Sequence, residues 1–295
     1  MGYLPLSVTN YYSNQVVKAY KAPLSGTLLV ARGEDLPPGT GTVTRDKVKN
    51  FTGKAKRGYR VRTVPRESEE REPNTVIVIE HTHGYEMHKQ AVKAYARVGE
   101  SVLNGEGARQ SGRLVAESLN GTFFNGDSNS GSKGLFADAE LDDYVVTEGK
   151  EWNTASPAPD SDIVEAIAEL TSPRLYTGLP IKMAVSAFAY NQLIKRIPNT
   201  NTSYMDYIAK IPAFQNGIND IYPVNELADD EGLLLYYGAE VAERLVEQDI
   251  ENYAVNDGKP DKDNMIYFNV DTYQALDIHH LDAMLPLKNL IDTEA

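Results

Sequence analysis

The chain has 295 residues, of which 41% are hydrophobic and 24% charged, with no cysteine and a formal net charge of −13. This composition predicts a folded protein with a sizeable core, and the lack of cysteine excludes disulfides, thiolate metal sites and cysteine nucleophiles. No apolar run reaches the roughly 18 residues of a membrane span, and the first residues do not resemble a secretory signal. We therefore expect a soluble protein of a reducing cytoplasm.

The charge is divided unevenly along the chain. Residues 1–66 hold twelve Lys and Arg against three Asp and Glu, about +9, and residues 67–295 hold 17 against 39, about −22. Most of the basic excess lies in residues 45–66, where large apolar side chains are few. Such a segment cannot bury itself.

The first 80 residues show strand patterns and no helical period. We expect strands at Thr27 to Ala31 and Thr42 to Thr44 around a Pro-Gly turn, an alternating strand at Tyr59 to Val64, and a β-branched strand at Thr75 to Ile79. The charged run Pro65 to Pro73 reads as an exposed tip or connection. Together they predict an extended arm followed by a long β-hairpin.

Two helices are predicted next. The first covers Tyr85 to Val98, and the second covers Ala108 to Phe124 with Leu114, Val115, Leu119 and Phe123 on one face. The second helix stops in a loop rich in Gly, Ser and Asp over residues 125–134.

From Asp160 onward, helices and strands alternate. We expect helices from Ser161 and over Ala187 to Ile197, and a strand over Ile181 to Val185. Further short strands are predicted at Asn219 to Val224, Gly232 to Tyr237, Arg244 to Glu247, Ile266 to Asp271 and Tyr273 to Ile278. This half is therefore α+β, and its end is mainly β.

The best candidate for a metal site is His81, His83 and His88, because alternate residues of a strand point to one face. Partly exposed histidines at a strand-to-helix junction explain this pattern without an ion, so we expect no metal and no cofactor. The loop over residues 126–133 has glycine spacing like that of a phosphate loop, but its Lys133 follows Ser132 and the loop follows a helix. No catalytic motif is visible, and the sequence predicts a protein that is not an enzyme.

The basic run has two interpretations. Clustered Lys and Arg suit nucleic-acid phosphates, whereas a basic hairpin on an acidic body is also complementary to a second copy of that body. We favour self-association. The predicted intersubunit contact residues are Arg45, Lys47, Lys49, Lys54, Lys56, Arg57, Arg60 and Arg62.

The order of these parts resembles one fold. The helix before residue 125 ends in the pair Phe123-Phe124 and continues through Gly126-Asp127 to Lys133-Gly134-Leu135. With the following runs Asp162 to Leu170, Lys182 to Leu193 and Glu247 to Leu287, this is similar to the Hong Kong 97 phage capsid fold of tailed-virus major capsid proteins and encapsulins. Each motif is loose, and the resemblance depends on their order over residues 20–290.

The resemblance implies an α+β fold with an N-terminal arm at residues 1–25 and an extended loop at 26–80. Interleaved peripheral and axial domains follow at 81–295, with a spine helix at 108–124. It implies a major capsid protein of the virion, assembled in the host cytoplasm from pentamers and hexamers into an icosahedral shell around double-stranded DNA. Scaffold, portal and cementing proteins are candidate partners.

The alternative is an encapsulin that encloses a cargo enzyme, and a third hypothesis is an enzyme built on the α+β half. Many encapsulins have an amphipathic N-terminal helix with tryptophan, whereas Tyr3 to Lys21 is polar and extended. This departure favours the virus capsid. A scaffolding segment is also absent from the N-terminal residues, which implies a separate scaffold or none.

Overall fold

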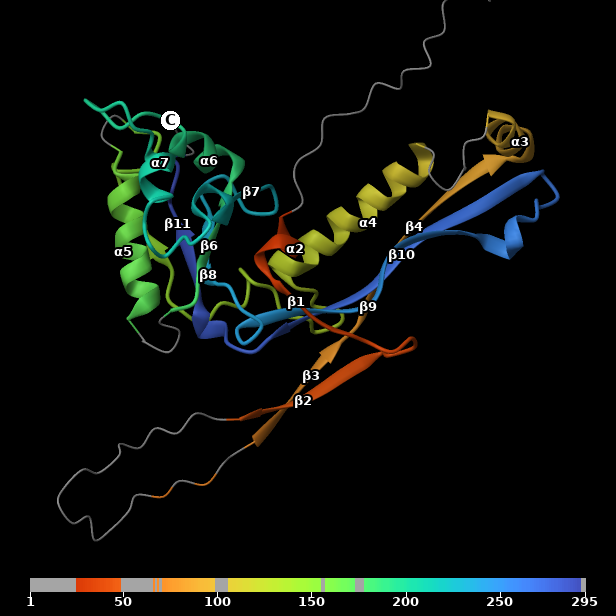
Figure 1. The fold of residues 1–295 in the computed structure, drawn as a ribbon, viewed down its shortest axis with the longest axis horizontal. Helices are drawn as coiled ribbons and strands as arrows, with labels where there is room; N and C mark the ends of the chain where they lie inside the picture. The colour runs from red at the N-terminus through yellow and green to blue at the C-terminus, as the bar shows by residue number, and fades with distance from the viewer. Residues whose placement is uncertain are drawn as a thin grey trace, which may run out of the picture.

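The structure, a computed structural model, describes residues 25–48, 66, 68, 71–98, 106–154, 157–172 and 178–292, with only the backbone for residues 47, 48, 95–98 and 257. Figure 1 shows three parts: a long four-stranded sheet under one long helix, a five-stranded sheet with shorter helices, and a projecting two-stranded ribbon. Within these residues, no helix is long and apolar enough to cross a membrane.

The four-stranded sheet has the strand order β1-β9-β10-β4. Its strands are β1 (Ala31–Asp35), β9 (Ala242–Ala254), β10 (Met265–Ile278) and β4 (Ile79–His88). Strand β1 runs parallel to β9, whereas β10 is antiparallel to both of its neighbours. The long helix α4 (Glu106–Asn125) packs against β4, β10 and β9.

Helix α4 confirms the predicted second helix. Val115, Leu119 and Phe123 are buried as the spacing indicated, but Leu114 is 42% exposed and does not belong to the packed face. Near its end, Asn120 accepts a hydrogen bond from the Gly26 backbone N–H at 2.6 Å. This contact belongs to a short helix α2 (Gly26–Leu29), so the strand predicted at Thr27 to Ala31 is wrong.

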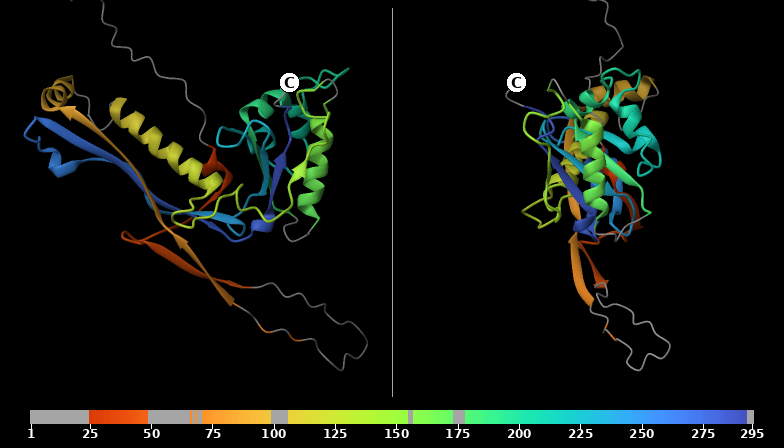
Figure 2. Two further views of the ribbon diagram at one scale, coloured as in Figure 1. Left: turned by 180° about the vertical axis from the view of Figure 1, so that it is seen from behind. Right: turned by 90° about the vertical axis from the view of Figure 1, so that its left-hand side faces the viewer.

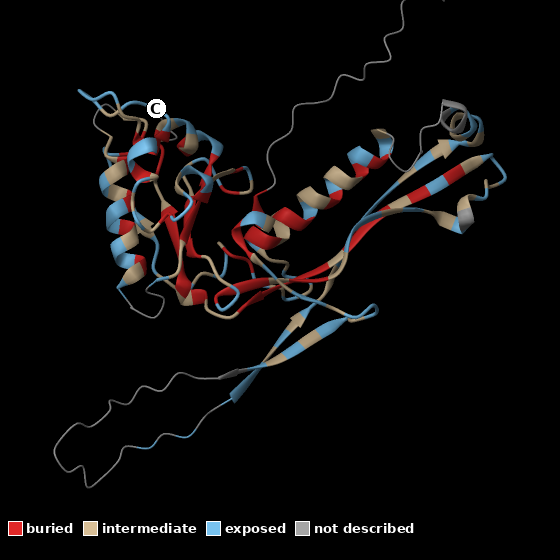
Figure 3. Cartoon of the chain, in the orientation of Figure 1, coloured by how far each residue is buried: buried red, intermediate tan, exposed pale blue. Residues whose placement is uncertain are grey.

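The five-stranded sheet has the order β5-β11-β8-β6-β7. Its strands are β5 (Tyr144–Val145), β11 (Met284–Lys288), β8 (Gly232–Tyr236), β6 (Ile181–Ser186) and β7 (Ile221–Val224). The helices beside it are α5 (Pro159–Thr171), α6 (Ala187–Leu193) and α7 (Tyr204–Ile208). Short 3-10 turns lie at Gly217–Asp220 (η2), Val255–Gly258 (η3) and Leu281–Ala283 (η4). Every residue of β6 and β8 is buried, and Figure 3 shows this core in red.

Other boundaries differ from the predictions. Strand β4 continues to His88, opposite Met265 of β10, so helix α3 (Lys89–Val98) starts later than Tyr85. Helix α6 ends at Leu193 rather than Ile197. The two strands expected on either side of Thr272 form one strand, β10, because Asp271 and Thr272 are both buried within the sheet.

The ribbon consists of β2 (Thr42–Val48) and β3 (Arg71–Ile77), paired antiparallel from Thr42 opposite Ile77 to Val48 opposite Arg71. Figure 2 shows from two sides that it extends away from both sheets. Of the ribbon side chains that the structure describes, none is buried. An isolated two-stranded ribbon is only marginally stable, so other contacts must hold it. The strand predicted at Tyr59 to Val64 lies outside the described residues.

Candidate functional site

The histidines of β4 pack against serines of α4. His81 Nδ1 lies 2.9 Å from Ser118 Oγ, and His83 Nδ1 lies 3.0 Å from Ser111 Oγ. Burial lowers the pKa of His81, and the nearby Asp127 carboxylate partly opposes this shift. These two contacts between His and Ser side chains therefore join strand β4 to helix α4. His88 makes a separate contact, in which it accepts a hydrogen bond from the Gln90 N–H at 3.3 Å. The absence of a metal function here stays a prediction.

The loop after α4 closes on itself. The Asp127 carboxylate accepts hydrogen bonds from the backbone N–H groups of Asn129 and Ser130 at 3.2 and 3.1 Å, and hydrogen bonds from these two residues lower its pKa. Gly126 has φ +69°, and a Cβ there would lie 2.5 Å from the Ser132 carbonyl oxygen. The loop is a compact turn that needs glycine, and its charged Asp127 is unsuited to phosphate.

One ionic cluster joins the ribbon to the body. Glu243 and Asp277 are 7% and 1% exposed, and His279 lies beside them, 3.7 Å from Glu243 Oε1 and 3.8 Å from Asp277 Oδ1. Their ligand atoms lie within 4.8 Å of one another, close enough to share a metal ion. However, the guanidinium of Arg45 contacts Glu243 and lies 3.5 Å from Asp277 Oδ2. Arg45 thus supplies the positive charge that an ion would supply.

The predicted basic contact residues fall into two groups. Arg45 is on β2 and pairs within its own chain, with Glu34 at 3.3 Å as well as with the cluster. The backbone of Lys47 lies on the same strand, opposite Glu72. The other members lie outside the described residues: Lys49, Lys54, Lys56, Arg57, Arg60 and Arg62. Their contact with a neighbouring subunit stays a prediction.

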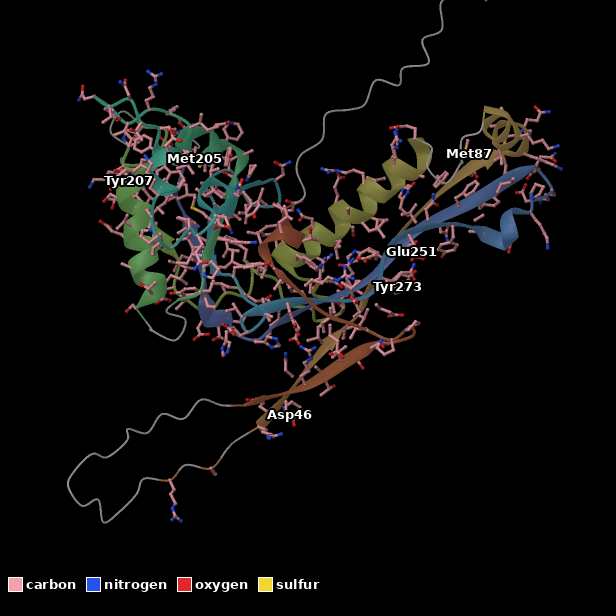
Figure 4. All side chains as sticks on the ribbon, in the orientation of Figure 1. Asp46, Met87, Met205, Tyr207, Glu251 and Tyr273 are labelled. Atoms are coloured by element: carbon pink, nitrogen blue, oxygen red, sulfur yellow. The ribbon has the colours of Figure 1, made fainter. Side chains whose placement is uncertain are left out.

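Sequence reasoning missed an acidic, tyrosine-rich face of the four-stranded sheet. Val270 contacts α4 at Gly112, so the alternating residues Asp271 and Tyr273 point to the opposite face. There, the Tyr253 hydroxyl donates to Asp271 at 2.7 Å, and a hydrogen bond to Glu80 raises the pKa of Tyr273 to about 12. Figure 4 labels Tyr273 on this sheet. Alternation along β10 was the available signal, but the predicted break at Thr272 concealed it.

A pocket of about 320 Å³ separates β3 from the loop at residues 130–133. Leu276 and Ile278 of β10 line it together with β3. The ribbon is therefore not tightly packed on this side. Its attachment to the body depends more on the ionic contacts of Arg45 than on packing against this loop.

A sequence model of the family described as "Major capsid protein" matches residues 60–230, which is more than half of the chain. Among curated protein sequences, none matches the chain significantly.

Solved capsid structures share the fold. The capsid of Myoviridae Phage XM1 matches with 14% identity and a TM-score of 0.71, covering 98% of this chain and 99% of that one. The capsid of the native GTA particle matches with 10% identity and a TM-score of 0.68, covering 96% and 95%. A virus-like particle from Pyrococcus furiosus matches with 14% identity and a TM-score of 0.56, covering 91% and 92%.

These matches confirm the predicted α+β capsid fold of the Hong Kong 97 type. The family match extends the conclusion beyond the fold, because it is a match of the sequence itself and covers residues 60–230. The chain belongs to the major capsid protein family and is a structural subunit of a capsid.

Proposed function

We propose that copies of this chain assemble, through pentamers and hexamers, into an icosahedral shell that encloses the double-stranded DNA of a tailed virus. The shell assembles in the host cytoplasm. The family match and the capsid fold support this proposal.

The projecting ribbon is the observation that carries it. Its described side chains are not buried, and its strands lead into the segment at residues 49–70. A projecting ribbon that is not packed against its own chain contributes little to the fold of that chain. In a shell built from many copies, such a ribbon can contact a neighbouring subunit. The partner that the ribbon fits is therefore another copy of this chain.

Charge favours the same partner. Residues 45–66 carry nine Lys and Arg against one Asp, and residues 67–295 carry about −22. The helix-free face of the four-stranded sheet presents Glu80 and Glu251, both exposed, beside the Tyr253 and Tyr273 hydroxyls. This face is a suitable acceptor for the basic segment, in which Lys54, Lys56 and Arg57 are central.

The proposed function includes a division of the chain into parts. We assign residues 1–25 to an arm, the extended loop to 26–80, and the interleaved peripheral and axial domains to 81–295 with α4 as the spine helix. Within the extended loop, α2 and β1 pack on α4 and β9, so the projecting portion is the ribbon and the segment between its strands.

An encapsulin that holds a cargo enzyme is the alternative. The match to the virus-like particle from Pyrococcus furiosus has a TM-score of 0.56, which is lower than the 0.71 of the match to the phage XM1 capsid. This difference favours the virus capsid over the encapsulin. We propose a scaffold, a portal or a cementing protein as candidate further partners of a virus capsid.

Electron microscopy of particles isolated from the cells that produce them tests the proposal. We expect closed shells tens of nanometres across with nuclease-resistant double-stranded DNA inside. Shells that contain a single enzyme and no DNA would favour the encapsulin, and a protein that stays monomeric at high concentration would contradict assembly.

A further inference from the structure

Two carboxylates face each other within the four-stranded sheet. Glu243 of β9 and Asp277 of β10 are directly opposed in the antiparallel register, and both are less than a tenth exposed. Like charges directly opposite on neighbouring strands destabilise a sheet, and burial increases the cost. The pair therefore needs a cation and further hydrogen bonds.

Both are supplied by the ribbon. Arg45 and Asn74 are opposed residues of β2 and β3. The Arg45 guanidinium contacts Glu243 and lies 3.5 Å from Asp277, while Asn74 Nδ2 donates to Asp277 Oδ1 at 3.0 Å. One cross-strand pair of the ribbon thus binds one cross-strand pair of the sheet.

The surrounding backbone leaves room for this contact. Gly33 of β1 lies so close to Glu243 that a Cβ would be 2.4 Å from Glu243 Oε2. Any other residue would displace the carboxylate that Arg45 contacts. Gly33 is therefore part of the arrangement, although it contributes no polar side chain.

Apart from the Arg45 and Asn74 contacts, the ribbon is joined to the sheet at its base: Val78 alone separates β3 from β4, and its N–H donates to the Gly41 carbonyl oxygen at 3.0 Å. Beyond this contact, the side chain of Asp46 is 57% exposed, and Figure 4 shows Asp46 at the end of β2 far from the sheet. On the other side of β3 lies the pocket of about 320 Å³. The ribbon therefore has space to tilt if the ionic contact is lost.

We infer that Arg45 and Asn74 form a latch that fixes the ribbon at one angle to the four-stranded sheet. Arg45 is a positioning residue: it sets the direction in which β2 and β3 leave the four-stranded sheet. The latch lies within one chain, so it can be tested separately from assembly.

The absence of cysteine allows site-directed spin labels without background. We would place labels at Pro73→Cys on the outer part of β3 and at Lys262→Cys beside β10, both exposed positions. Labelled chains would be diluted into unlabelled full-length chains, so that double electron-electron resonance reports distances within one chain. The parent should give one narrow distance distribution, and Arg45→Gln should broaden it at least twofold.

Two further variants separate positioning from stability. Arg45→Gln combined with Glu243→Gln and Asp277→Asn leaves neither buried carboxylate charged, and the remaining partner Glu34 is exposed, so the variant should fold well and still give the broad distribution. Arg113→Gln removes a half-buried Arg that pairs with Glu117 on α4, away from the ribbon, and it should leave the distribution narrow. A narrow distribution in the triple variant, or broadening by Arg113→Gln equal to that of Arg45→Gln, would overturn the latch. Particle formation, measured by sedimentation on the same samples, reports on assembly independently.

Discussion

The body and the ribbon of this subunit are stabilised in opposite ways. Strands β6 and β8 are buried along their whole length, and helix α4 buries Val115, Leu119 and Phe123 against its surroundings. The ribbon buries no described side chain, and the contacts of its side chains with the body are polar: Arg45 with Glu34, Glu243 and Asp277, and Asn74 with Asp277. Hydrophobic burial is the main source of folding free energy, so the body can fold alone, whereas the ribbon requires partners. Each of the following predictions separates these two sources of stability.

The largest expected effect comes from reversing charge beyond the ribbon. Lys54→Glu, Lys56→Glu and Arg57→Glu together should abolish or strongly impair assembly in sedimentation velocity, because the basic segment would repel the acidic body. Circular dichroism of the subunit should stay unchanged, since a basic segment with few apolar side chains has little to bury.

A matched variant keeps the charges: Lys54→Arg, Lys56→Arg and Arg57→Lys should assemble as the parent does. Normal assembly of the charge-reversed variant at low and moderate salt would show that the electrostatic part of the account is wrong.

Truncating a core residue should lower the stability of the unassembled chain as well as that of the shell. Phe123 is 1% exposed, and Phe123→Ala should lower the free energy of unfolding by about 3–5 kcal/mol through lost burial and a new cavity. Ile77 on the ribbon is 38% exposed, and Ile77→Ala should cost under about 1 kcal/mol. Urea denaturation of the unassembled chain measures both, and equal losses would contradict the division between body and ribbon.

The latch should have an intermediate effect on stability. Arg45→Gln leaves two buried carboxylates without their cation and should cost ~2 kcal/mol. Adding Glu243→Gln and Asp277→Asn should recover most of that loss, whereas Arg113→Gln should cost under about 1 kcal/mol, because it breaks one partly exposed pair within α4. If the neutral triple variant were no more stable than Arg45→Gln, unpaired charge would not explain the loss.

The smallest effect is a pH dependence within the body. Trp152 Nε1 donates to Asp162 Oδ2 at 2.9 Å, yet burial raises the pKa of Asp162 above its ordinary value of 3.8. The folded chain therefore holds this proton more tightly than the unfolded chain. The resulting stability is complete below pH 3.8 and is lost as pH rises through the raised pKa.

Asp162→Asn should remove this loss and flatten the stability profile in that range. The fluorescence of Trp152, the single tryptophan, reports unfolding at each pH. An unchanged slope in the variant would exclude Asp162 as the group responsible.

The sequence predicted those elements whose apolar spacing matches their packing. Helix α4 is one example, because Val115, Leu119 and Phe123 of its predicted apolar face are buried. Strands β6 and β8 are others, because these largely apolar runs are buried along their whole length. The division of β10 into two strands was wrong because Asp271 interrupts the apolar pattern. Its partners Tyr253 and Gln248 come from β9, at a distance in sequence that no local pattern reveals.

The candidate site shows the same limit. Clustered cations indicated a contact segment, but the pairings of Arg45 with Glu243 and of Asn74 with Asp277 join residues about 200 positions apart. The helix α2 was missed because four apolar or small residues are consistent with either strand or helix, and the contact between Gly26 and Asn120 decides between them.

The central claim is that the basic segment of one subunit lies on the acidic body of its neighbour. Carbodiimide cross-linking of shells assembled from mixed light and heavy-isotope chains tests it, because only intersubunit links join the two isotopes. We predict mixed-isotope links from Lys49, Lys54 or Lys56 to carboxylates of the four-stranded sheet or α4, among them Glu80 and Glu251. Links confined to a single isotope, or the absence of any link from these lysines in intact shells, would contradict the account.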